Sequence, residues 1–373
     1  CTWARALAAK LRYREDIQLA IVSVADEDSV KKFHVDNVDF YFLPNGKEVM
    51  RSGGGEKIQD SWKYIISDFK PDLVHIHGSE SMVPYELIKM KPDVPLFLTL
   101  QGILSNYYKD AYAGMEMKDV IRTYSLRDVV RHSGIIWDRK KEIKRSGYEK
   151  EMLKGIQYIG GRTTWDKVSS LAVNPEAKYI YAPELIRPEF YQSTRWNVNN
   201  IERHRIFMHQ GFKPIKGLHI VLDAMKILKK KYSDIHWWII GAGELEEQLK
   251  KQVKDNELEE YITFLGLKAN PYPYIRSCDL LVQPSRWEGK SVVLDEAKIL
   301  AKPILATNYS TIKDQLKDKK EGLITDISPN AIAEGIAKLR ENYQLYNSIQ
   351  SYLDKHEYGN EREVAQYYKL LGE

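Results

Sequence analysis

The sequence has few cysteines, no long apolar run and no excess of either charge, and each absence excludes a class of protein. Cys1 and Cys278 are the only cysteines in 373 residues, so no disulfide framework is predicted and a reducing, cytoplasmic setting is favoured. No apolar run reaches the roughly 18 to 20 residues of a membrane span, and no signal peptide opens the chain. The 56 basic and 52 acidic residues are too evenly balanced for a protein that binds nucleic acid through phosphate neutralisation.

Length and pattern predict two α/β domains. A chain of 373 residues exceeds the roughly 250 to 300 at which one hydrophobic core stops growing. Short apolar segments alternate with amphipathic ones, which is typical of parallel sheets covered by helices on both faces. Pro188 and the polar run 192–200 predict a linker, which separates a first domain (1–190) from a second (201–355). The predicted strands are 18–24, 38–42, 73–76, 96–100, 155–159, 179–181, 206–208, 236–240, 263–265, 279–282 and 304–306.

The most informative segment lies between residues 278 and 300, where an apolar strand, a glycine-containing loop and an apolar helix follow one another. Every residue three or four positions from Glu296 within that helix is aliphatic, so its carboxylate projects from an apolar face. A buried carboxylate without partners is strongly destabilising, so hydrogen-bond donors come from the protein or from a ligand. A ligand rich in hydroxyl groups fits this requirement.

A second carboxylate narrows the class of ligand. Glu288 precedes Glu296 by eight residues, which is about 12 Å if the stretch is fully helical at 1.5 Å per residue. This span is close to the reach of a sugar nucleotide. Between the two, the backbone N–H groups of Gly289, Lys290 and Ser291 are predicted to lie at a helix N-terminus, which favours phosphate. The alternative is a first-turn acid favoured by the helix dipole, together with a satisfied core acid.

The Glu-x7-Glu spacing after a strand, followed by Lys302-Pro-Ile-Leu-Ala-Thr307, resembles the donor-site signature of family-4-type retaining glycosyltransferases with the GT-B fold. The resemblance covers most of the chain and implies two doubly wound, Rossmann-like α/β domains that face each other across a cleft. In that family the second glutamate binds the ribose of a nucleoside diphosphate and the first contacts the donor sugar. These roles are expected for Glu296 and Glu288.

The family also sets expectations for the two ends of the chain. A first strand and a glycine-rich turn precede the first helix of these enzymes, whereas this chain opens on a helix predicted over 1–11. The first strand and its glycine-rich loop are therefore expected to be missing from it. The segment 356–373 is expected to form a helix that returns to the first domain, as is common in GT-B enzymes.

The resemblance implies transfer of a sugar from a nucleoside-diphosphate sugar to a saccharide or lipid-linked saccharide acceptor, with retention of configuration. It further implies a role in bacterial cell-surface polysaccharide biosynthesis, with the nucleotide sugar as co-substrate and no metal or other cofactor. Two other classes stay open. One is a nucleotide-sugar epimerase of GT-B architecture, and the other is a non-catalytic sugar-binding or scaffold protein.

A lysine and a glycine at the start of a predicted helix indicate a phosphate site. A lysine at this end of a helix faces the positive end of the dipole, which is usually avoided unless an anion lies between them. The family pattern Gly-Arg-x4-Lys-Gly places an arginine and a lysine on the donor phosphates, and Lys216-Gly217 matches its second half. Gly211 occupies the arginine position, so Lys290 or Arg286 is expected to substitute. A solvent-exposed lysine beside a turn glycine is the alternative.

Gly241 and Gly243 follow a predicted strand and precede a polar helix. A dinucleotide-binding motif is not complete here, because Glu246 stands at the third glycine position. In GT-B enzymes the corresponding turn lines the nucleotide pocket, so both glycines are donor-site candidates. A tight turn that requires glycine is an equal alternative.

In the first domain, His75 and His77 lie on the same side of a predicted strand. Open parallel sheets bind ligands at the carboxyl ends of their strands, where His77 is expected. The resembling enzymes carry a histidine here that meets the donor sugar and the acceptor, so His77 is the catalytic candidate together with Glu288. The alternatives are a core histidine or a zinc ligand, although no companion ligand cluster accompanies the pair in the sequence.

Three more residues of the first domain are acceptor-side candidates. Gln101 and Gly102 follow the next predicted strand, and Arg162 follows a later one in a stretch that resembles bacterial polysaccharide-assembly enzymes. Arg162 is expected to orient phosphate or acceptor, and a helix-capping turn through Thr163 or Thr164 is the alternative.

Two charged segments complete the sequence predictions. Seven basic and three acidic residues lie between Arg139 and Lys154, a pattern that suits either peripheral contact with the inner face of the cell membrane or a solvated helix. The Asp-x-Asp of Asp26 and Asp28 is read as a helix start rather than a metal site. Lys216 and helix termini are expected to stabilise the departing diphosphate.

Overall fold

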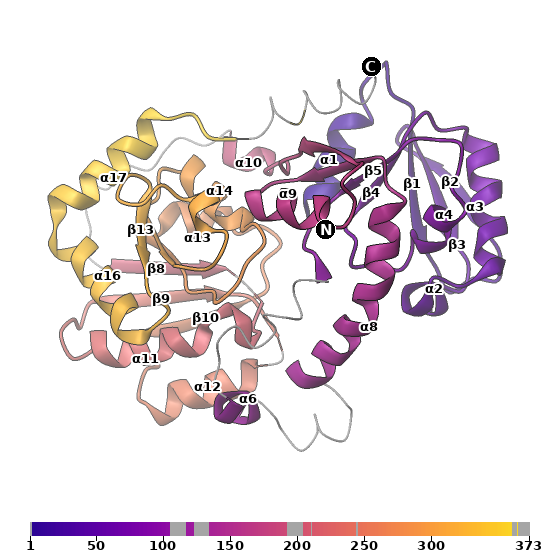
Figure 1. The fold of residues 1–373 in the computed structure, drawn as a ribbon. Coiled ribbons are helices and arrows are strands. Elements are labelled where there is room, and N and C mark those ends of the chain that lie inside the picture. The colour runs from indigo at the N-terminus through magenta and orange to yellow at the C-terminus, as the bar shows by residue number, and fades with distance from the viewer. Residues whose placement is uncertain are drawn as a thin grey trace. The chain divides into compact units, whose positions relative to one another are not determined.

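The computed structural model describes residues 2–104, 117–122, 134–191, 204–209, 211–243, 245–359 and 364. The chain forms two compact α/β units (Figure 1). Unit 1 consists of Cys1–Lys109, Lys140–Arg187 and Asn360–Glu373, and unit 2 consists of Asp110–Arg139 and Pro188–Gly359.

Unit 1 contains two sheets. Their strands are β1 (Leu19–Val24), β2 (Lys31–Val35), β3 (Val38–Leu43), β4 (Val74–His77), β5 (Leu96–Thr99), β6 (Tyr158–Gly161) and β7 (Lys178–Tyr181). The first sheet has the order β1-β3-β2, with β2 antiparallel to β3. The second sheet has the order β4-β5-β6-β7 and is entirely parallel. Its parallel strands place the residues that follow β4, β5 and β6 along one edge.

The helices of unit 1 follow from amphipathic patterning and local caps. They are α1 (Thr2–Leu11), α2 (Gly46–Ser52), α3 (Glu56–Phe69), α4 (Tyr85–Lys89), α8 (Ile135–Lys154) and α9 (Thr164–Leu171), of which α8 begins in unit 2. In α3, Ile58, Trp62 and Ile65 repeat at helical spacing and are all buried. Thr163 and Asp166 form a capping box that starts α9. All four residues of β5 are buried, as expected for a central parallel strand.

Unit 2 contains one parallel sheet of six strands. The strands are β8 (His204–His209), β9 (Ile235–Ile240), β10 (Ile262–Gly266), β11 (Leu280–Gln283), β12 (Ile304–Thr307) and β13 (Gly322–Thr325). Their order is β10-β9-β8-β11-β12-β13, so the direction of winding reverses between β8 and β11. Ligands of doubly wound sheets bind outside the carboxyl ends of the strands at such a switch point.

Helices cover both faces of this sheet (Figure 1). The helices of unit 2 are α6 (Met117–Arg122), α10 (Pro188–Tyr191), the short 3₁₀ helix η2 (Pro214–Lys216), α11 (Leu218–Leu228), α12 (Glu246–Asp255), α13 (Tyr272–Ser277), α14 (Val292–Ile299), α15 (Ile312–Gln315), α16 (Pro329–Glu341) and α17 (Tyr343–Lys355). Helix α11 packs beside α16, and α13 packs beside α14. The core of unit 2 includes α11 together with the fully buried Trp237 of β9.

The sequence located most of these strands, but two local predictions were wrong and two strands were missed. The strand predicted over 155–159 begins at Tyr158 and ends at Gly161, because residues 155–157 form the turn after α8. Strands β2 and β13 were not predicted. Asp26 and Asp28 lie in a bend between β1 and β2 and start no helix. In the described part of the chain, no helix combines the length and the apolar character needed to cross a membrane.

Two further sequence predictions lie largely outside the described residues. The linker 192–200 is not described. Of the segment 356–373, Val364 is buried in a cluster with Leu7, Phe97 and Ile180 of unit 1. A C-terminal helix in this segment stays a prediction.

Candidate functional site

In unit 2, the loops that follow β8 and β11 meet at the switch point of the sheet. The backbone N–H of Arg286 donates to the carbonyl of Ile215 at 2.9 Å, which joins the two loops. Gly217 has φ +74°, and a Cβ at this position would lie 2.1 Å from the carbonyl oxygen of Pro284. The close approach of the two backbones therefore requires glycine at position 217.

This junction brings Lys216 and Glu288 together, although they lie 72 residues apart. Lys216 Nζ donates to both carboxylate oxygens of Glu288 at 2.7 Å. Gln283 Nε2 and Ser285 Oγ donate to Oε1 of the same carboxylate at 2.9 and 2.8 Å. Glu288 is 8% exposed, and these three donors offset the cost of burying its charge. A cation and a carboxylate thus meet at the carboxyl edge of the sheet.

The segment between the two glutamates differs from the expected anion site. The backbone N–H of Ser291 donates to Gln315 Oε1 at 2.7 Å, so a protein side chain engages this donor. Lys290 Nζ lies 2.5 Å from Asp295 Oδ2, which ties this lysine back to helix α14. The N–H of Ser291 and the ammonium group of Lys290 thus both contact protein groups, and phosphate binding by residues 289–291 stays a prediction. Gly289 is buried beside them, and its carbonyl accepts from Gln315 Nε2 at 3.3 Å.

Helix α14 buries more charged side chains than its sequence suggests. Glu296 is 3% exposed, as expected for a carboxylate on the apolar face. Asp295 is also buried, and Lys298 Nζ lies 3.2 Å from its Oδ1. Burial raises the pKa of Asp295, but the charges of Lys290 and Lys298 outweigh it and the pKa is lowered overall. The two glutamates are not joined by one helix, because α14 begins at Val292 and Glu288 lies in the preceding loop.

The other donor-site candidates lie around the loop after β8. Gly241 directly follows β9, and Gly243 lies against that loop, where Phe212 N donates to the carbonyl of Ala242 at 3.0 Å. Gly211 is exposed, and the nearest described atom beyond its chain neighbours, the carbonyl oxygen of Ala242, would lie 4.0 Å from a Cβ there. Arg286 Nη2 lies 3.5 Å from His219 Nε2, next to the first turn of α11. Arg286 is therefore placed beside the loop of Lys216.

Sequence reasoning missed several residues that build this site. Tyr309 follows β12 and is 2% exposed, and its hydroxyl has no hydrogen-bond partner among the described residues. Burial, and then the charges of Glu288 and Asp295, raise the pKa of Tyr309 well above its usual value. The signal for Gln283 and Ser285 was present, because polar residues at the end of an apolar strand are candidates for a site at the carboxyl edge.

In unit 1, the histidine pair lies at the end of β4. The rings of His75 and His77 are 3.9 Å apart, on the same side of the strand as predicted. Thr99 Oγ1 lies 3.0 Å from His75 Nε2 and 3.3 Å from His77 Nδ1. Part of His77 is solvent-exposed, but it lies in a concave region where surrounding protein desolvates its ring and lowers its pKa to about 4. His77 is therefore neutral at physiological pH.

The acceptor-side candidates adjoin this pair. Arg162 is buried, with Nη1 2.6 Å from Glu184 Oε1 and Nη2 donating to the carbonyl of Gln101 at 3.1 Å. The carbonyl of Gly102 accepts from Ser79 Oγ at 3.3 Å. The capping alternative also holds, because Thr163 is the N-cap of α9 while Arg162 faces the loop after β5. His77, Gln101 and Glu184 line one cavity of about 10 Å³, which is large enough for about one water molecule.

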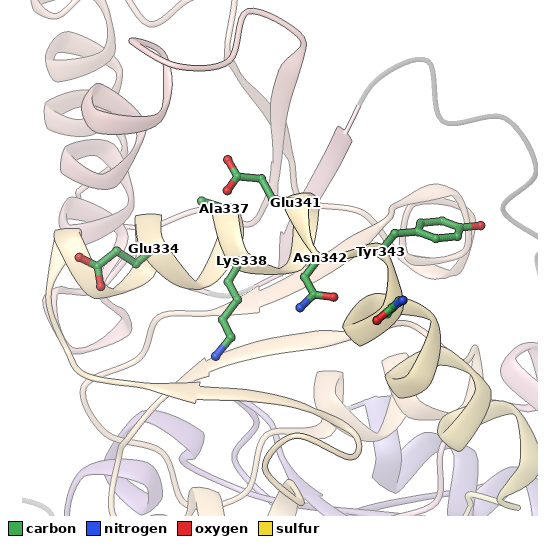
Figure 2. Close-up of a pocket in the computed structure, with 7 residues that line it drawn as sticks. Glu334, Ala337, Lys338, Glu341, Asn342 and Tyr343 are labelled. Carbon is green, nitrogen blue, oxygen red and sulfur yellow. The ribbon is translucent and has the colours of Figure 1, made fainter.

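A larger cavity lies at the opposite end of unit 2. It has a volume of about 600 Å³ and lies where α16 ends and α17 begins, lined by Glu334, Ala337, Lys338, Glu341, Asn342, Tyr343 and Gln344. Arg340, in the last turn of α16, is paired with Asp234, which directly precedes β9. The cavity is therefore at the amino ends of the strands. Figure 2 shows the ring of Tyr343 directed away from Lys338, so the side chains do not converge on one point.

A metal site is not found among the described residues, where no group of three or more His, Cys, Asp or Glu side chains is placed to hold an ion. Asp26 Oδ2 instead pairs with Lys47 Nζ at 2.9 Å.

Comparison with known proteins finds a family match within the second unit. Residues 194–356 match the model of the family "Glycosyl transferases group 1". An uncharacterized glycosyltransferase of Haemophilus influenzae is 31% identical over 160 residues, which are 42% of this chain and 45% of the relative. A poly(ribitol-phosphate) alpha-N-acetylglucosaminyltransferase of Staphylococcus aureus is 26% identical over 131 residues, 35% of this chain and 27% of the relative. These alignments thus span less than half the length of each relative.

Solved structures resemble the whole chain. Sucrose-phosphate synthase of Thermosynechococcus elongatus has a TM-score of 0.73 and 15% identity, with 99% of this chain and 90% of that chain covered. HepE of Anabaena, in complex with UDP and glucose, has a TM-score of 0.72 and 15% identity, with 100% and 95% covered. The GT-B fold predicted from the sequence motifs is confirmed, and the predicted resemblance to glycosyltransferases is confirmed by the family match.

Proposed function

We propose that this protein transfers a sugar from a nucleoside-diphosphate sugar to a saccharide or lipid-linked saccharide acceptor, with retention of configuration, in cell-surface polysaccharide biosynthesis. The observation that carries the proposal is the contact between Lys216 and Glu288 at the switch point of unit 2. A sugar nucleotide has its negative charge on the diphosphate and its hydroxyl groups on the adjoining sugar. A cation beside a hydrogen-bonding carboxylate matches the junction of these two parts.

Each residue has a role in this proposal. Lys216 binds the diphosphate and stabilises the charge that develops on it as the glycosidic bond breaks. Glu288 accepts hydrogen bonds from the transferred sugar, and Glu296 accepts them from the ribose. Gly217, Gly241 and Gly243 allow the loops to approach the nucleotide closely. On the acceptor side, neutral His77 meets the sugar, and Arg162 holds the Gln101–Gly102 loop through its bond to the Gln101 carbonyl.

The absence of an arginine at Gly211 requires a substitute, and we assign this role to Arg286. Its backbone is fixed to Ile215, next to Lys216, and its guanidinium reaches His219 at the start of α11. Lys290 pairs with Asp295 of α14, whereas Arg286 directly adjoins the Lys216 loop. We further propose that no metal ion takes part, so that Lys216, Arg286 and the helix termini supply the positive charge.

Thermal unfolding with a panel of nucleotides tests donor binding. Uridine, guanosine and adenosine diphosphates are added separately, and one of them is expected to raise the unfolding temperature. Glu296→Ala is expected to abolish this rise, whereas the exposed Glu334→Ala, at the α16–α17 cavity, is expected to keep it. No stabilisation by any of the three, or equal stabilisation of both variants, contradicts the assignment of this site.

Product analysis tests the reaction class. With the stabilising nucleotide as its sugar conjugate and a saccharide acceptor, the expected product is a new glycoside with the anomeric configuration of the donor, formed equally with and without a chelator. Turnover of the donor without an acceptor to an epimeric sugar indicates the epimerase instead. Binding without turnover of either kind indicates a non-catalytic protein.

Helix α8 provides a surface for peripheral contact with a membrane that carries a lipid-linked acceptor. Its exposed basic side chains include Lys140, Lys141, Lys144 and Arg145, and Ile143 among them is 42% exposed. An anionic surface attracts such a cluster. We expect co-sedimentation with phosphatidylglycerol vesicles but not with neutral ones, and loss of binding when Lys140 and Lys144 are both changed to Glu. Equal binding to both vesicle types, or none, contradicts the membrane contact.

A further inference from the structure

A carboxylate that the sequence did not single out lies among the acceptor-side candidates of unit 1. Glu80 belongs to the turn that follows β4 at the carboxyl edge of the parallel sheet. Gly78 in this turn has φ +84°, and a Cβ there would lie 2.4 Å from Glu80 Oε2 and 3.4 Å from Gln101 Cγ. The carboxylate of Glu80 is therefore folded over the backbone of Gly78, beside Gln101. Only glycine permits this arrangement.

A buried network of hydrogen bonds fixes the turn that carries Glu80. Ser79 Oγ donates to Glu149 Oε1 at 2.6 Å, and the backbone N–H of Leu104 donates to the same oxygen at 2.9 Å. Glu149 of α8 is completely buried. Gly78 N also donates to the carbonyl of Thr99 at 2.8 Å, which ties the turn to β5. Glu80 is thus held on a rigid turn, as a group that positions a ligand must be.

The surrounding charges leave the carboxylate of Glu80 without a cationic partner among the described residues. Arg162 interacts with Glu80 electrostatically, but its guanidinium is paired with Glu184 and bonded to the Gln101 carbonyl. Glu149 repels Glu80, and neutral His77 offers no charge. Burial, with the repulsion from Glu149, raises the pKa of Glu80 to about 7. Its own backbone N–H and that of Ser79 are the donors that oppose this shift.

We propose that Glu80 binds the acceptor saccharide by accepting a hydrogen bond from one of its hydroxyl groups. The assignment rests on the proposed function, because the neighbouring Gln101 and His77 are acceptor-side and sugar-contacting candidates in it. A carboxylate that is half-buried, held on a rigid turn and not paired with a cation of the described residues forms a strong charge-assisted hydrogen bond with a hydroxyl donor. Protonation neutralises the Glu80 carboxylate and weakens it as a hydrogen-bond acceptor, so saccharide binding weakens as the pH falls below 7.

Ligand-observed NMR with free sugars tests the proposal without requiring turnover. The probes are D-glucose, D-galactose, D-mannose and N-acetyl-D-glucosamine, measured by saturation transfer between pH 5.5 and 8.5. At least one sugar is expected to bind more strongly at pH 8 than at pH 5.5. Glu80→Gln is expected to weaken this binding about tenfold at pH 8 and to abolish its pH dependence. Circular dichroism confirms that the variant is folded.

Glu151→Gln is the matched control, because Glu151 is an exposed carboxylate of unit 1 that is hydrogen-bonded to Tyr85. This variant is expected to bind sugar as the native protein does, with the same pH profile. Native affinity and pH dependence in Glu80→Gln overturn the proposal, and so does the absence of binding by all four sugars. Nucleoside-diphosphate binding, which depends on unit 2, is measured separately. If the protein binds sugar but no nucleoside diphosphate, the proposed function is overturned. The role of Glu80 is then still decided by the sugar-binding measurement.

Discussion

At the scale of single residues, Gly211 is the main departure from the donor-site pattern. Its position is exposed, and beyond its chain neighbours no atom of the described residues lies closer than 4.0 Å to where a Cβ would be. Gly211→Arg is therefore expected to fold normally and to add a guanidinium beside Lys216. A hydrogen bond to a charged group contributes about 1.5 to 3 kcal/mol, so the affinity for the nucleoside diphosphate that stabilises the protein should rise about tenfold or more.

Isothermal titration calorimetry with the nucleoside diphosphate selected by the thermal panel checks this expectation. Gly147→Arg is the control, because it adds the same charge in open space on α8 and should leave the affinity unchanged. Unchanged or weaker binding by Gly211→Arg contradicts the placement of the diphosphate at this loop.

Glu80 also affects the stability of the fold. Its pKa is raised from 4.5 to about 7 in the folded protein, so folding favours the protonated form. The contribution of Glu80 to the unfolding free energy is fully present below pH 4.5 and is lost as the pH rises through 7. His77 has the opposite effect, because its pKa is lowered from 6.5 to about 4, so stability is lost as the pH falls through that range.

Comparison of the native protein with Glu80→Gln isolates the contribution of Glu80. The difference in unfolding free energy is expected to change in favour of the variant by roughly 3 kcal/mol between pH 4.5 and 8. Urea titrations of both proteins at several pH values measure it. A difference that does not vary with pH shows that the carboxyl group is not perturbed by the fold.

At the scale of elements, the junction of the loops after β8 and β11 depends on one glycine. Gly217→Ala places a methyl group against the Pro284 carbonyl and adopts a positive φ that alanine disfavours. A destabilisation on the order of 1 to 3 kcal/mol is expected, together with weaker nucleotide binding. Gly147→Ala is the matched control, because its Cβ meets no atom within 4 Å. It should stabilise α8 by about 0.5 to 1 kcal/mol. Chemical denaturation distinguishes the two, and equal stability of both variants contradicts the close approach of the two loops at Gly217.

The sequence predicted elements better than contacts. Strands such as β9 and β12 were located because they are apolar runs bounded by turns. Strand β2 was missed because all five of its residues are exposed and no apolar face marks it. Strand β13 was missed because it is short and begins with glycine.

In the candidate site too, the sequence predicted the position of residues better than their contacts. The carboxyl edge followed from strand order, and Lys216 and Glu288 followed from the family pattern. Their direct contact across 72 residues, however, depends on loop geometry. The engagement of Ser291 by Gln315 also could not be predicted, because it joins two segments that no periodic pattern links.

At the scale of the whole molecule, two features of unit 2 compete as nucleotide sites. The larger hollow lies between α16 and α17, but it is at the amino ends of the strands and its side chains diverge (Figure 2). The junction of Lys216 and Glu288 lies at the carboxyl ends, at the switch point, and combines a cation with a buried carboxylate. Chemistry and topology therefore favour the junction over the larger volume.

Hydrogen–deuterium exchange across the full chain decides between these two sites. The nucleoside diphosphate selected by the thermal panel is expected to slow amide exchange in residues 211–217 and 284–291, because a bound diphosphate orders both loops and restricts their local opening. Residues 334–344, which contain the cavity lining, should exchange at an unchanged rate. Lys216→Ala should remove the protection of both loops, whereas Lys338→Ala, at the cavity, should leave it intact. Protection confined to 334–344, or protection of the loops that survives Lys216→Ala, would place the nucleotide elsewhere and refute the role assigned to the switch point.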